Sequence, residues 1–424
     1  MVKNSVEELA ILGGTPAFDE PLLPGRPNVG NREHLLARIN DTLDRGSLTN
    51  NGPYVQEFER KISELLGVKH CIAVCNATVA LSIGARAAGL TGEVIIPSWT
   101  FIATAHAFQW LGITPVLCDV DPVTHNIDPS CVEEMITART TGIVGVHLWG
   151  RPCDVDALAN IAERHSLKLL MDAAHAFGCS HQGRMIGNFG DAEVFSFHAT
   201  KFLNTLEGGA VTTNDDHLAA KLRSMRNFGL VGYDGVSFGT SDNANGKIND
   251  ISVSYLGTNG KMNDISAAMG LTSLESMDEF LALNRRNYER YAEELRGLPG
   301  VYLLPYDDIN KHNYHYVVLE LDPSAAQLSR DELMQILWAE NVKVRRWWSP
   351  GCHRAEPYCA RYPRAELMFP VTEKLLKTVL ALPTGMAITP DDVTTVCSII
   401  RTAVSQGPAI RRRLSGLESK LATK

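Results

Sequence analysis

Three features that would point to particular classes of protein are missing from this sequence. No apolar run approaches the roughly 20 residues that a membrane-spanning helix needs, and the start of the chain lacks the basic-then-apolar order of a secretory signal. We therefore expect a cytoplasmic protein with no membrane partner. There is also no excess of basic residues: 40 lysines and arginines face 48 acidic residues, and the net charge is -8. This balance argues against nucleic acid as the main partner.

Paired cysteines are missing as well. The nine cysteines are scattered along the chain and form no C-x-x-C pair, so we predict neither a disulfide framework nor a metal site. The chain does have an ordinary globular composition, with 45% hydrophobic and 21% charged residues over 424 positions. That length exceeds a single hydrophobic core and favours two domains.

Short apolar runs alternate with helical patterns from about residue 55 onward. Strands of this kind, separated by helices, imply an α/β domain with a mostly parallel sheet covered on both faces. In such sheets ligands bind beyond the carboxyl ends of the strands, so the residues just after each strand are the first candidates for a site. The apolar runs lie at residues 70–76, 93–96, 115–118, 142–146, 167–171, 194–197 and 209–212.

The helical patterns divide the chain further. Residues 154–165 read as a helix with Asp154 as its N-cap, and residues 265–295 are helix-like throughout. A strand-like run at 314–319 is followed by a helical pattern at 331–339. The order indicates a second, smaller α+β domain after the α/β domain.

We divide the chain into three parts on this basis: an N-terminal arm at 1–29, a large domain at 30–275 and a small C-terminal domain at 276–424. Residues 234–250 are rich in Gly, Ser, Asn and Asp and too polar for a core. We predict that they form a mobile loop.

The strongest functional signal is an Asp and a Lys at the ends of two different strands. Asp172 closes one strand and Lys201 follows a later one. Pyridoxal phosphate needs a lysine amine for its imine and a carboxylate that keeps the pyridine nitrogen protonated. Alone, Asp172 would read as a helix cap and Lys201 as a surface lysine. Together, and followed by a tight Gly208-Gly209 turn that lets the backbone approach something bulky, they favour a cofactor site.

Other residues after strands fit the same cofactor. The N–H groups of Ala77 and Thr78 open a helix and can hold a phosphate, and Ser196 and His198 can add donors from a neighbouring strand end. His175 is positioned to meet the phenolic oxygen of the cofactor, although a histidine there can equally be a structural donor.

An aromatic segment also follows a strand. Residues 97–101 include Trp99 and Phe101, and an aromatic ring there can lie over a flat cofactor. The alternative is that these rings pack in the core.

These segments resemble the DegT/DnrJ-type sugar aminotransferases, which are fold-type I pyridoxal phosphate enzymes related in architecture to aspartate aminotransferase. The resemblance covers nearly everything from Pro24 to Ile400. It implies a large domain with a mostly parallel, seven-stranded type of sheet between helices, and a smaller α+β C-terminal domain. The matching segments are residues 48–53, 76–78, 97–101, 146–150, 172–175, 196–201 and 207–210.

The resemblance implies a role for each cofactor position. Lys201 would be the Schiff-base lysine and proton shuttle, and Asp172 the partner of the pyridinium nitrogen. The remaining contacts would be His175 to the cofactor, Ala77, Thr78 and Ser196 to its phosphate, Phe101 as the stacking ring in preference to Trp99, and Asn259 to the phosphate of the neighbouring subunit's cofactor. A homodimer with shared active sites follows from the last contact. The family's Tyr and Arg after this Asn are here Gly260 and Lys261.

Candidate substrate contacts are Thr49, His198, Trp347, Trp348 and His353. The family's C-terminal His corresponds to His353, with one residue inserted before it. The two tryptophans would form a wall of the sugar or base pocket, or else part of the small-domain core.

The function implied is transfer of an amino group from L-glutamate to a keto group of a nucleotide-linked deoxysugar, for aminosugar biosynthesis. The nucleotide would be dTDP and the carbon C4 in preference to C3, with the cofactor passing through its pyridoxamine phosphate form. A related class of enzymes that removes a sugar hydroxyl has histidine in place of the imine lysine, so Lys201 favours transamination. Two alternatives stay open: amination of a free keto-cyclitol, and a cofactor-binding sensor without turnover.

Overall fold

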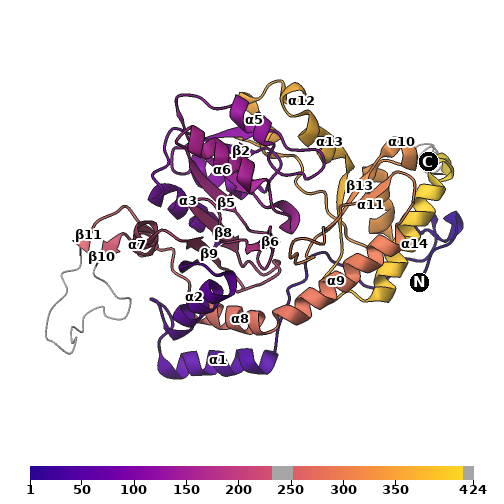
Figure 1. Cartoon of the computed structure of the whole chain (residues 1–424). Helices are drawn as coiled ribbons and strands as arrows, with labels where there is room; N and C mark the ends of the chain where they lie inside the picture. The colour runs from indigo at the N-terminus through magenta and orange to yellow at the C-terminus, as the bar shows by residue number, and fades with distance from the viewer. Residues whose placement is uncertain (232–251, 414–424) are drawn as a thin grey trace.

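One sheet organises the larger part of the protein (Figure 1). The computed structural model describes residues 1–231 and 252–413, and within them the largest sheet has seven strands in the order β1-β9-β8-β5-β4-β2-β3. From β8 through β5, β4 and β2 to β3 all neighbours are parallel, whereas β9 is antiparallel to both β1 and β8. The predicted mostly parallel sheet is confirmed. Its strands are β1 (His70–Val74), β2 (Glu93–Pro97), β3 (Thr114–Cys118), β4 (Thr140–Val146), β5 (Lys168–Asp172), β8 (Ala192–Ser196) and β9 (Gly209–Thr213).

Helices cover both faces of this sheet because its strands are apolar on both sides. Val144 and Leu170 face a core shared with α3 (Ala77–Ala87), α4 (Ile102–Gln109) and α7 (Asp216–Met225). The preceding residues, Ile143 and Leu169, point to the opposite face. That face is covered by α2 (Pro53–Leu66), α5 (Pro129–Glu134), α6 (Val155–Arg164) and α8 (Asp264–Glu275). Asp154 caps α6 as predicted, accepting a hydrogen bond from the N–H of Ala157 at 3.0 Å.

The helical pattern over 265–295 is two helices rather than one. The chain breaks at Ser276 (φ -102°, ψ 7°) between α8 and α9 (Met277–Glu294). No glycine or proline marks the break, and both sides keep helical periodicity, so the pattern did not reveal it. In Figure 1, α8 lies under the large sheet whereas α9 runs away from it toward the C-terminal part of the chain.

The C-terminal part forms an antiparallel sheet of β12 (Val301–Leu303), β13 (Val317–Leu321) and β14 (Val379–Leu382). It packs with α9, α11 (Arg330–Ala339) and α14 (Pro390–Ser405). The predicted strand and helix are therefore present, with the strand shifted to 317–321. The remaining α-helices and strands of the described residues are α1 (Arg32–Arg45), α10 (Pro323–Ala326), α12 (Ala365–Met368), α13 (Pro370–Thr378) and the two-residue strands β6 (Ser180–His181), β7 (Arg184–Met185), β10 (Leu230–Val231) and β11 (Ser252–Val253).

Each of the two hydrophobic cores, one around the large sheet and one around the C-terminal sheet, contains residues from a distant part of the chain. Val6 and Leu9 of the first 29 residues are buried in the C-terminal core, and Figure 1 shows the N-terminus beside α14 at that end of the molecule. Conversely, Cys352, Tyr358 and Phe369 pack into the large domain. The domain boundaries stay a prediction. The loop expected at 234–250 lies outside the described residues.

None of the helices in the described ranges is long and apolar enough to cross a membrane.

Candidate active site

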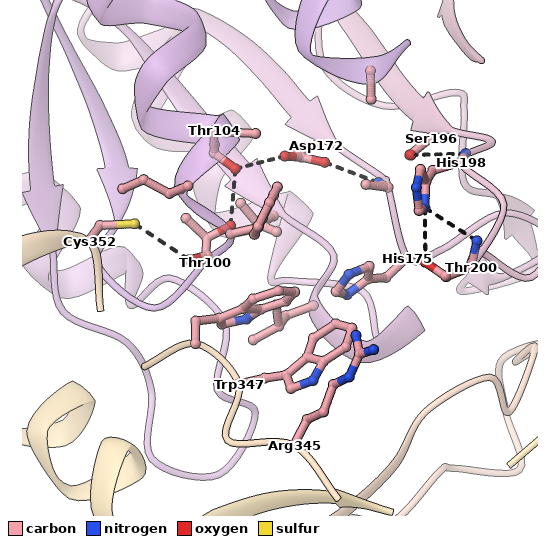
Figure 2. A pocket seen from close by; sticks show the side chains of 18 of the residues that line it. Thr100, Thr104, Asp172, His175, Ser196, His198, Thr200, Arg345, Trp347 and Cys352 are labelled. Carbon is pink, nitrogen blue, oxygen red and sulfur yellow. Dashed lines mark hydrogen bonds between the residues drawn. The ribbon is translucent and has the colours of Figure 1, made fainter. Parts of the chain in front are cut away.

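A cavity of about 810 Å³ opens at the carboxyl ends of the parallel strands. Its other wall comes from residues 344–352, which belong to the C-terminal part of the chain (Figure 2). Ten of the thirteen predicted site residues line it: Ala77, Thr78, Phe101, Asp172, His175, Ser196, His198, Lys201, Trp347 and Trp348. Because parallel strands present their carboxyl ends at one edge, residues from Ala77 to Lys201 meet on one wall of this space.

Lys201 brings an amine to the cavity. It lies in the turn after β8, where its N–H donates to the carbonyl of His198 at 2.8 Å. Its Nζ lies 3.5 Å from the hydroxyl of Tyr316. Burial lowers the pKa of Lys201 to about 8, while the charge of Asp172 acts in the opposite direction. A substantial fraction of the amine is therefore neutral, and so nucleophilic, slightly above pH 7.

Asp172 ends β5 with a buried carboxylate, each of whose oxygens accepts one hydrogen bond (Figure 2). One oxygen accepts a hydrogen bond from the hydroxyl of Thr104 at 2.9 Å and the other from the N–H of Ala174 at 3.1 Å. Burial raises the pKa of Asp172, and these two donors and the Lys201 amine oppose that rise. The two donors hold the carboxylate in position at the cavity wall. From there it can accept a further hydrogen bond from a protonated ring nitrogen.

His175 is held in one tautomer by the neighbouring turn. Its Nδ1 accepts a hydrogen bond from the N–H of Trp149 at 3.2 Å, which leaves Nε2 to carry the proton as a donor. Burial, followed by the charges of Lys201 and His315, lowers the pKa of His175 well below its ordinary value. The side chain is therefore a neutral hydrogen-bond donor, suited to an anionic oxygen on a ligand.

The start of α3 presents backbone N–H groups to the cavity. Asn76 caps the helix by accepting a hydrogen bond from the N–H of Val79 at 2.9 Å, and Ala77 and Thr78 line the cavity. A helix N-terminus is a favourable position for a phosphate. The turn at Gly208-Gly209 has a different use from the one expected: a Cβ at Gly209 would lie 2.8 Å from the Ala77 nitrogen. The glycine lets β9 approach the start of α3, not a ligand.

Aromatic rings form one wall. Trp348 lies between Trp149 and Phe101, with ring centroids 5.7 Å and 5.6 Å away, and Trp347 is 4.4 Å from it. Phe101 is 56% exposed, whereas Trp99 is 1% exposed and belongs to the core. Of the two predicted aromatic residues, Phe101 is therefore the one available to a ligand. Trp347 and Trp348 line the cavity and also pack on a buried cluster drawn from both parts of the chain.

Three predicted residues do not line this cavity. His353 is 1% exposed, and its Nε2 lies 2.8 Å from the carboxylate of Glu373. That buried contact holds the ring away from the cavity, so the expected substrate contact by His353 is corrected. Thr49 and Asn259 are exposed side chains elsewhere on the same chain.

Several residues of the site were not foreseen. Thr104 orients Asp172, Trp149 orients His175, and Arg345 and Arg346 add positive charge to the cavity. The only signal for the arginines was their place immediately before the two tryptophans. Thr104 follows Phe101 by three residues, within the first turn of α4, but nothing in its surroundings marks it as a partner of Asp172.

A buried lysine amine and a carboxylate at the end of a mostly parallel sheet, beside a helix N-terminus and an aromatic wall, define a fold-type I pyridoxal-phosphate-dependent enzyme. Residues 30–401 match the DegT/DnrJ/EryC1/StrS aminotransferase family, and the chain belongs to this family. It is an aminotransferase.

Individual relatives agree with this assignment. A dTDP-4-amino-4,6-dideoxy-D-glucose transaminase of Shigella dysenteriae is 34% identical over 336 residues, which are 78% of this chain and 86% of the relative. The crystal structure of DesI in the presence of its TDP-sugar product is 46% identical, covers 97% of this chain and 100% of the DesI chain, and has a TM-score of 0.87. The structure of DesV of S. venezuelae in complex with a ketimine intermediate is 29% identical, with 90% and 99% of the two chains covered and a TM-score of 0.78.

Proposed function

We propose that this cavity binds pyridoxal 5'-phosphate, held covalently by Lys201. The observation that carries the proposal is that the amine of Lys201 and the carboxylate of Asp172 line the same cavity, where desolvation lowers the pKa of the amine to about 8. When bound, the cofactor supplies an aldehyde carbon that takes up an amino group and a ring that accepts electrons. The polar groups of the cavity would match its parts: Asp172 would accept a hydrogen bond from the protonated ring nitrogen, His175 would donate to the phenolic oxygen, and Ala77, Thr78 and Ser196 would donate to the phosphate.

Side chains of the cavity would carry out the remaining steps. Released from its covalent link, the Nζ of Lys201 is the base that moves a proton between the substrate carbon and the cofactor carbon. Its lowered pKa keeps part of this amine neutral near neutral pH. Phe101 covers one face of the ring, and the aromatic wall excludes water from the reacting atoms.

The substrates we propose are L-glutamate as the amino donor and a dTDP-linked 4-keto-6-deoxysugar as the acceptor, with amination at C4. The names of two relatives support a nucleotide-linked sugar, since one is a dTDP-4-amino-4,6-dideoxy-D-glucose transaminase and the other is described with its TDP-sugar product. A cavity of about 810 Å³ is large enough for such a ligand beside the cofactor. The product would enter aminosugar biosynthesis, in a cytoplasmic enzyme.

The alternatives are a C3 ketone, a free keto-cyclitol and a sensor without turnover. Membership in an aminotransferase family speaks against the sensor. Incubation of the enzyme with L-glutamate and a panel of dTDP-linked 3-keto and 4-keto sugars and a keto-cyclitol, read by product mass, separates the others. We expect a mass gain matching amination for the 4-keto sugar. Turnover of the cyclitol alone would refute the proposal.

The covalent link has its own test. After borohydride reduction of the enzyme with bound cofactor, peptide mapping should find the label on Lys201. The Lys201→Arg variant should give no label at that position. A label on another lysine in the wild-type enzyme would overturn the assignment of the site.

We further propose a homodimer in which Asn259 contacts the phosphate of the partner's cofactor. In its own chain, Asn259 is exposed and does not line the cavity. Its side-chain oxygen accepts a hydrogen bond from the Nζ of Lys261 at 2.7 Å, so this lysine holds the amide in position. The two residues would act on the neighbouring site as a unit.

A further inference from the structure

Residues 313–316 connect the C-terminal part of the chain to both sides of the cavity. They lie immediately before β13, and the backbone carbonyl of Asn313 accepts a hydrogen bond from Asn284 of α9 at 3.1 Å. Asn313, His315 and Tyr316 are buried, and none of the three is among the residues that line the cavity. Their polar groups therefore serve other parts of the protein rather than a ligand.

The side chain of Asn313 holds the turn that carries His175. Its Nδ2 donates to the carbonyl of His175 at 2.8 Å and to the carbonyl of Phe177 at 3.1 Å. Its Oδ1 accepts from the N–H of His315 at 3.1 Å. A Cβ at Gly150 would lie 2.9 Å from this oxygen, so the glycine makes room for the amide. Both N–H groups of the amide are thus used on the turn of His175, whose backbone they fix.

The ring of His315 holds the turn that carries Lys201. Its Nε2 donates to the carbonyl of Thr200 at 2.9 Å, because a carbonyl can only accept. Burial, opposed by this hydrogen bond, lowers the pKa of His315 to about 4, so the ring is neutral and Nε2 carries its one proton. Within residues 1–231 and 252–413 the Nδ1 has no partner, so in that part of the chain the Thr200 carbonyl is the ring's only hydrogen-bond partner.

Tyr316 lies between the side chains of the two turns. Its ring centroid is 4.3 Å from that of His175, and its hydroxyl is 3.5 Å from the Nζ of Lys201. One short segment therefore contacts the imidazole, the amine and the backbone behind each of them. Because the segment is buried and closely packed, it has little freedom to shift relative to either turn.

We propose that Asn313 and His315 are positioning residues, which together keep the reactive amine and the imidazole of the cavity at a fixed separation. This role rests on the proposed function, in which Lys201 moves a proton at the cofactor carbon and His175 donates to the phenolic oxygen of the same ring. Both groups must be in place at once, and a displacement of about 1 Å in either is enough to slow such a reaction about 100-fold.

Hydrogen exchange of the cofactor-free protein tests the contact of His315 without any reaction. His315→Phe removes the donor to the Thr200 carbonyl and leaves that turn less firmly held. The backbone N–H of Lys201, which donates to the carbonyl of His198 at 2.8 Å, should then exchange about tenfold faster than in the wild type. Mass spectrometry of a peptide covering residues 197–202 gives the rate.

The contact of Asn313 is tested in the same way at the other turn. Asn313→Asp keeps the oxygen that accepts from the N–H of His315 and removes the two donors. The N–H of Ala176, which donates to the carbonyl of Ala173 at 2.9 Å, should exchange about tenfold faster. Each variant should leave the other turn within about threefold of the wild type, because the two contacts are separate hydrogen bonds.

In the enzyme with bound cofactor, the same variants should separate kcat from KM. We expect kcat for amino transfer to fall about 10- to 100-fold in His315→Phe and in Asn313→Asp. The KM values for glutamate and the keto-sugar should change less than about threefold, because neither side chain lines the cavity. His315→Gln, whose amide can donate to the same carbonyl, should recover most of the lost kcat and restore slow exchange.

Tyr314→Phe is the matched control. Tyr314 lies between the two positioning residues, and its ring packs on Tyr288 and Tyr306. The substitution keeps the ring, so kcat and the exchange of both turns should stay at their wild-type values. Should His315→Phe fail to fold, as thermal melting would show, Asn313→Asp tests the same role at the other turn.

Three outcomes would refute this role: unchanged exchange at both turns, faster exchange without a fall in kcat, or a rise in KM with kcat unchanged. If His315→Gln is as slow as His315→Phe, packing of the ring and not the hydrogen bond is responsible, which also overturns it. The exchange measurement needs no cofactor. A wild-type protein that binds no pyridoxal phosphate would therefore overturn the proposed function while the exchange result still stands.

Discussion

His147 and Glu193 form a buried pair beneath the sheet end that carries the site. The Nε2 of His147 lies 3.2 Å from a carboxylate oxygen of Glu193, and both side chains are completely buried. The other Glu193 oxygen accepts from the N–H groups of Gly187 and Phe189 at 2.8 and 2.6 Å. The Nδ1 of His147 accepts from the N–H of Cys153 at 3.1 Å. Each polar atom therefore has its partner.

This pair supports both ring contacts of the proposed cofactor site. The N–H of His147 donates to the carbonyl of Asp172 at 2.9 Å, and two residues later the N–H of Trp149 donates to His175. Trp149 has a positive φ of 60°, a conformation that costs energy for a tryptophan and must be held by its surroundings. The buried pair anchors the turn that holds it.

We predict that Glu193→Gln destabilises the protein by about 3 kcal/mol, because removing one partner of a buried, hydrogen-bonded pair leaves the others unsatisfied. The side-chain amide of glutamine has only one oxygen that can accept. Its NH₂ group cannot accept a hydrogen bond either from His147 or from the N–H groups of Gly187 and Phe189. The free energy of unfolding in urea is the measurement. Glu64→Gln is the control, since the Arg60–Glu64 pair is more than half exposed on both sides and should contribute under about 1 kcal/mol. Equal midpoints for both variants would contradict the prediction.

A second prediction concerns the pH at which Lys201 becomes reactive. Burial disfavours the charged amine, so in the cofactor-free protein labelling of Lys201 by an amine reagent should be half-maximal near pH 8. As the pH falls below this value the amine is protonated and labelling is lost. In Asp172→Asn the profile should shift to lower pH, because the carboxylate that favours the charged amine is gone. Peptide mass spectrometry gives the profile, with exposed Lys69 as an internal reference. A shift to higher pH in this variant would contradict it.

The Asp172–Thr104 hydrogen bond provides a third test. Thr104→Val removes a donor that favours the ionised carboxylate, so the pKa of Asp172 should rise further. Cofactor affinity should fall about tenfold near neutral pH, and as the solution is acidified it should be lost at a higher pH than in the wild type. Equilibrium dialysis of pyridoxal phosphate measures both. Thr104→Ser keeps the hydroxyl and should behave as the wild type; if it matches Thr104→Val instead, packing and not the hydrogen bond is responsible.

The parts of the site that sequence could predict are those set by strand ends. Asp172 and Lys201 follow strands whose apolar runs were plain, and parallel strands end at one edge, so their meeting in one cavity was foreseeable. Thr104 and Arg345 were not, because their contacts depend on how α4 and the C-terminal sheet pack against the large domain. The sequence around Thr104 and the sequence around Arg345 contain no pattern that would predict this packing.

Three further differences between the expectations and the structure have identifiable causes. The Gly208-Gly209 turn was expected to let the backbone approach something bulky in the cofactor site, but Gly209 lies close to the backbone of Ala77. A glycine in the sequence indicates that another group comes close, but does not identify that group. The break at Ser276 was hidden because the residues on both sides are helical and no helix-breaking residue separates them. His353 was aligned with a family position, yet its contact with Glu373 is decided by tertiary packing.

The proposed homodimer gives a prediction that depends on which subunit completes each site. Lys201→Met should be inactive, and Asn259→Ala should be strongly impaired if it loses the phosphate contact. When the two variants are unfolded, mixed and refolded together, hybrid dimers should contain one site with both residues intact, because Lys201 comes from one chain and Asn259 from the other. Amino transfer by the mixture should therefore exceed that of either variant refolded alone. If Asn259 acts within its own chain, no hybrid site is complete, and the mixture should show only the average of the separate variants.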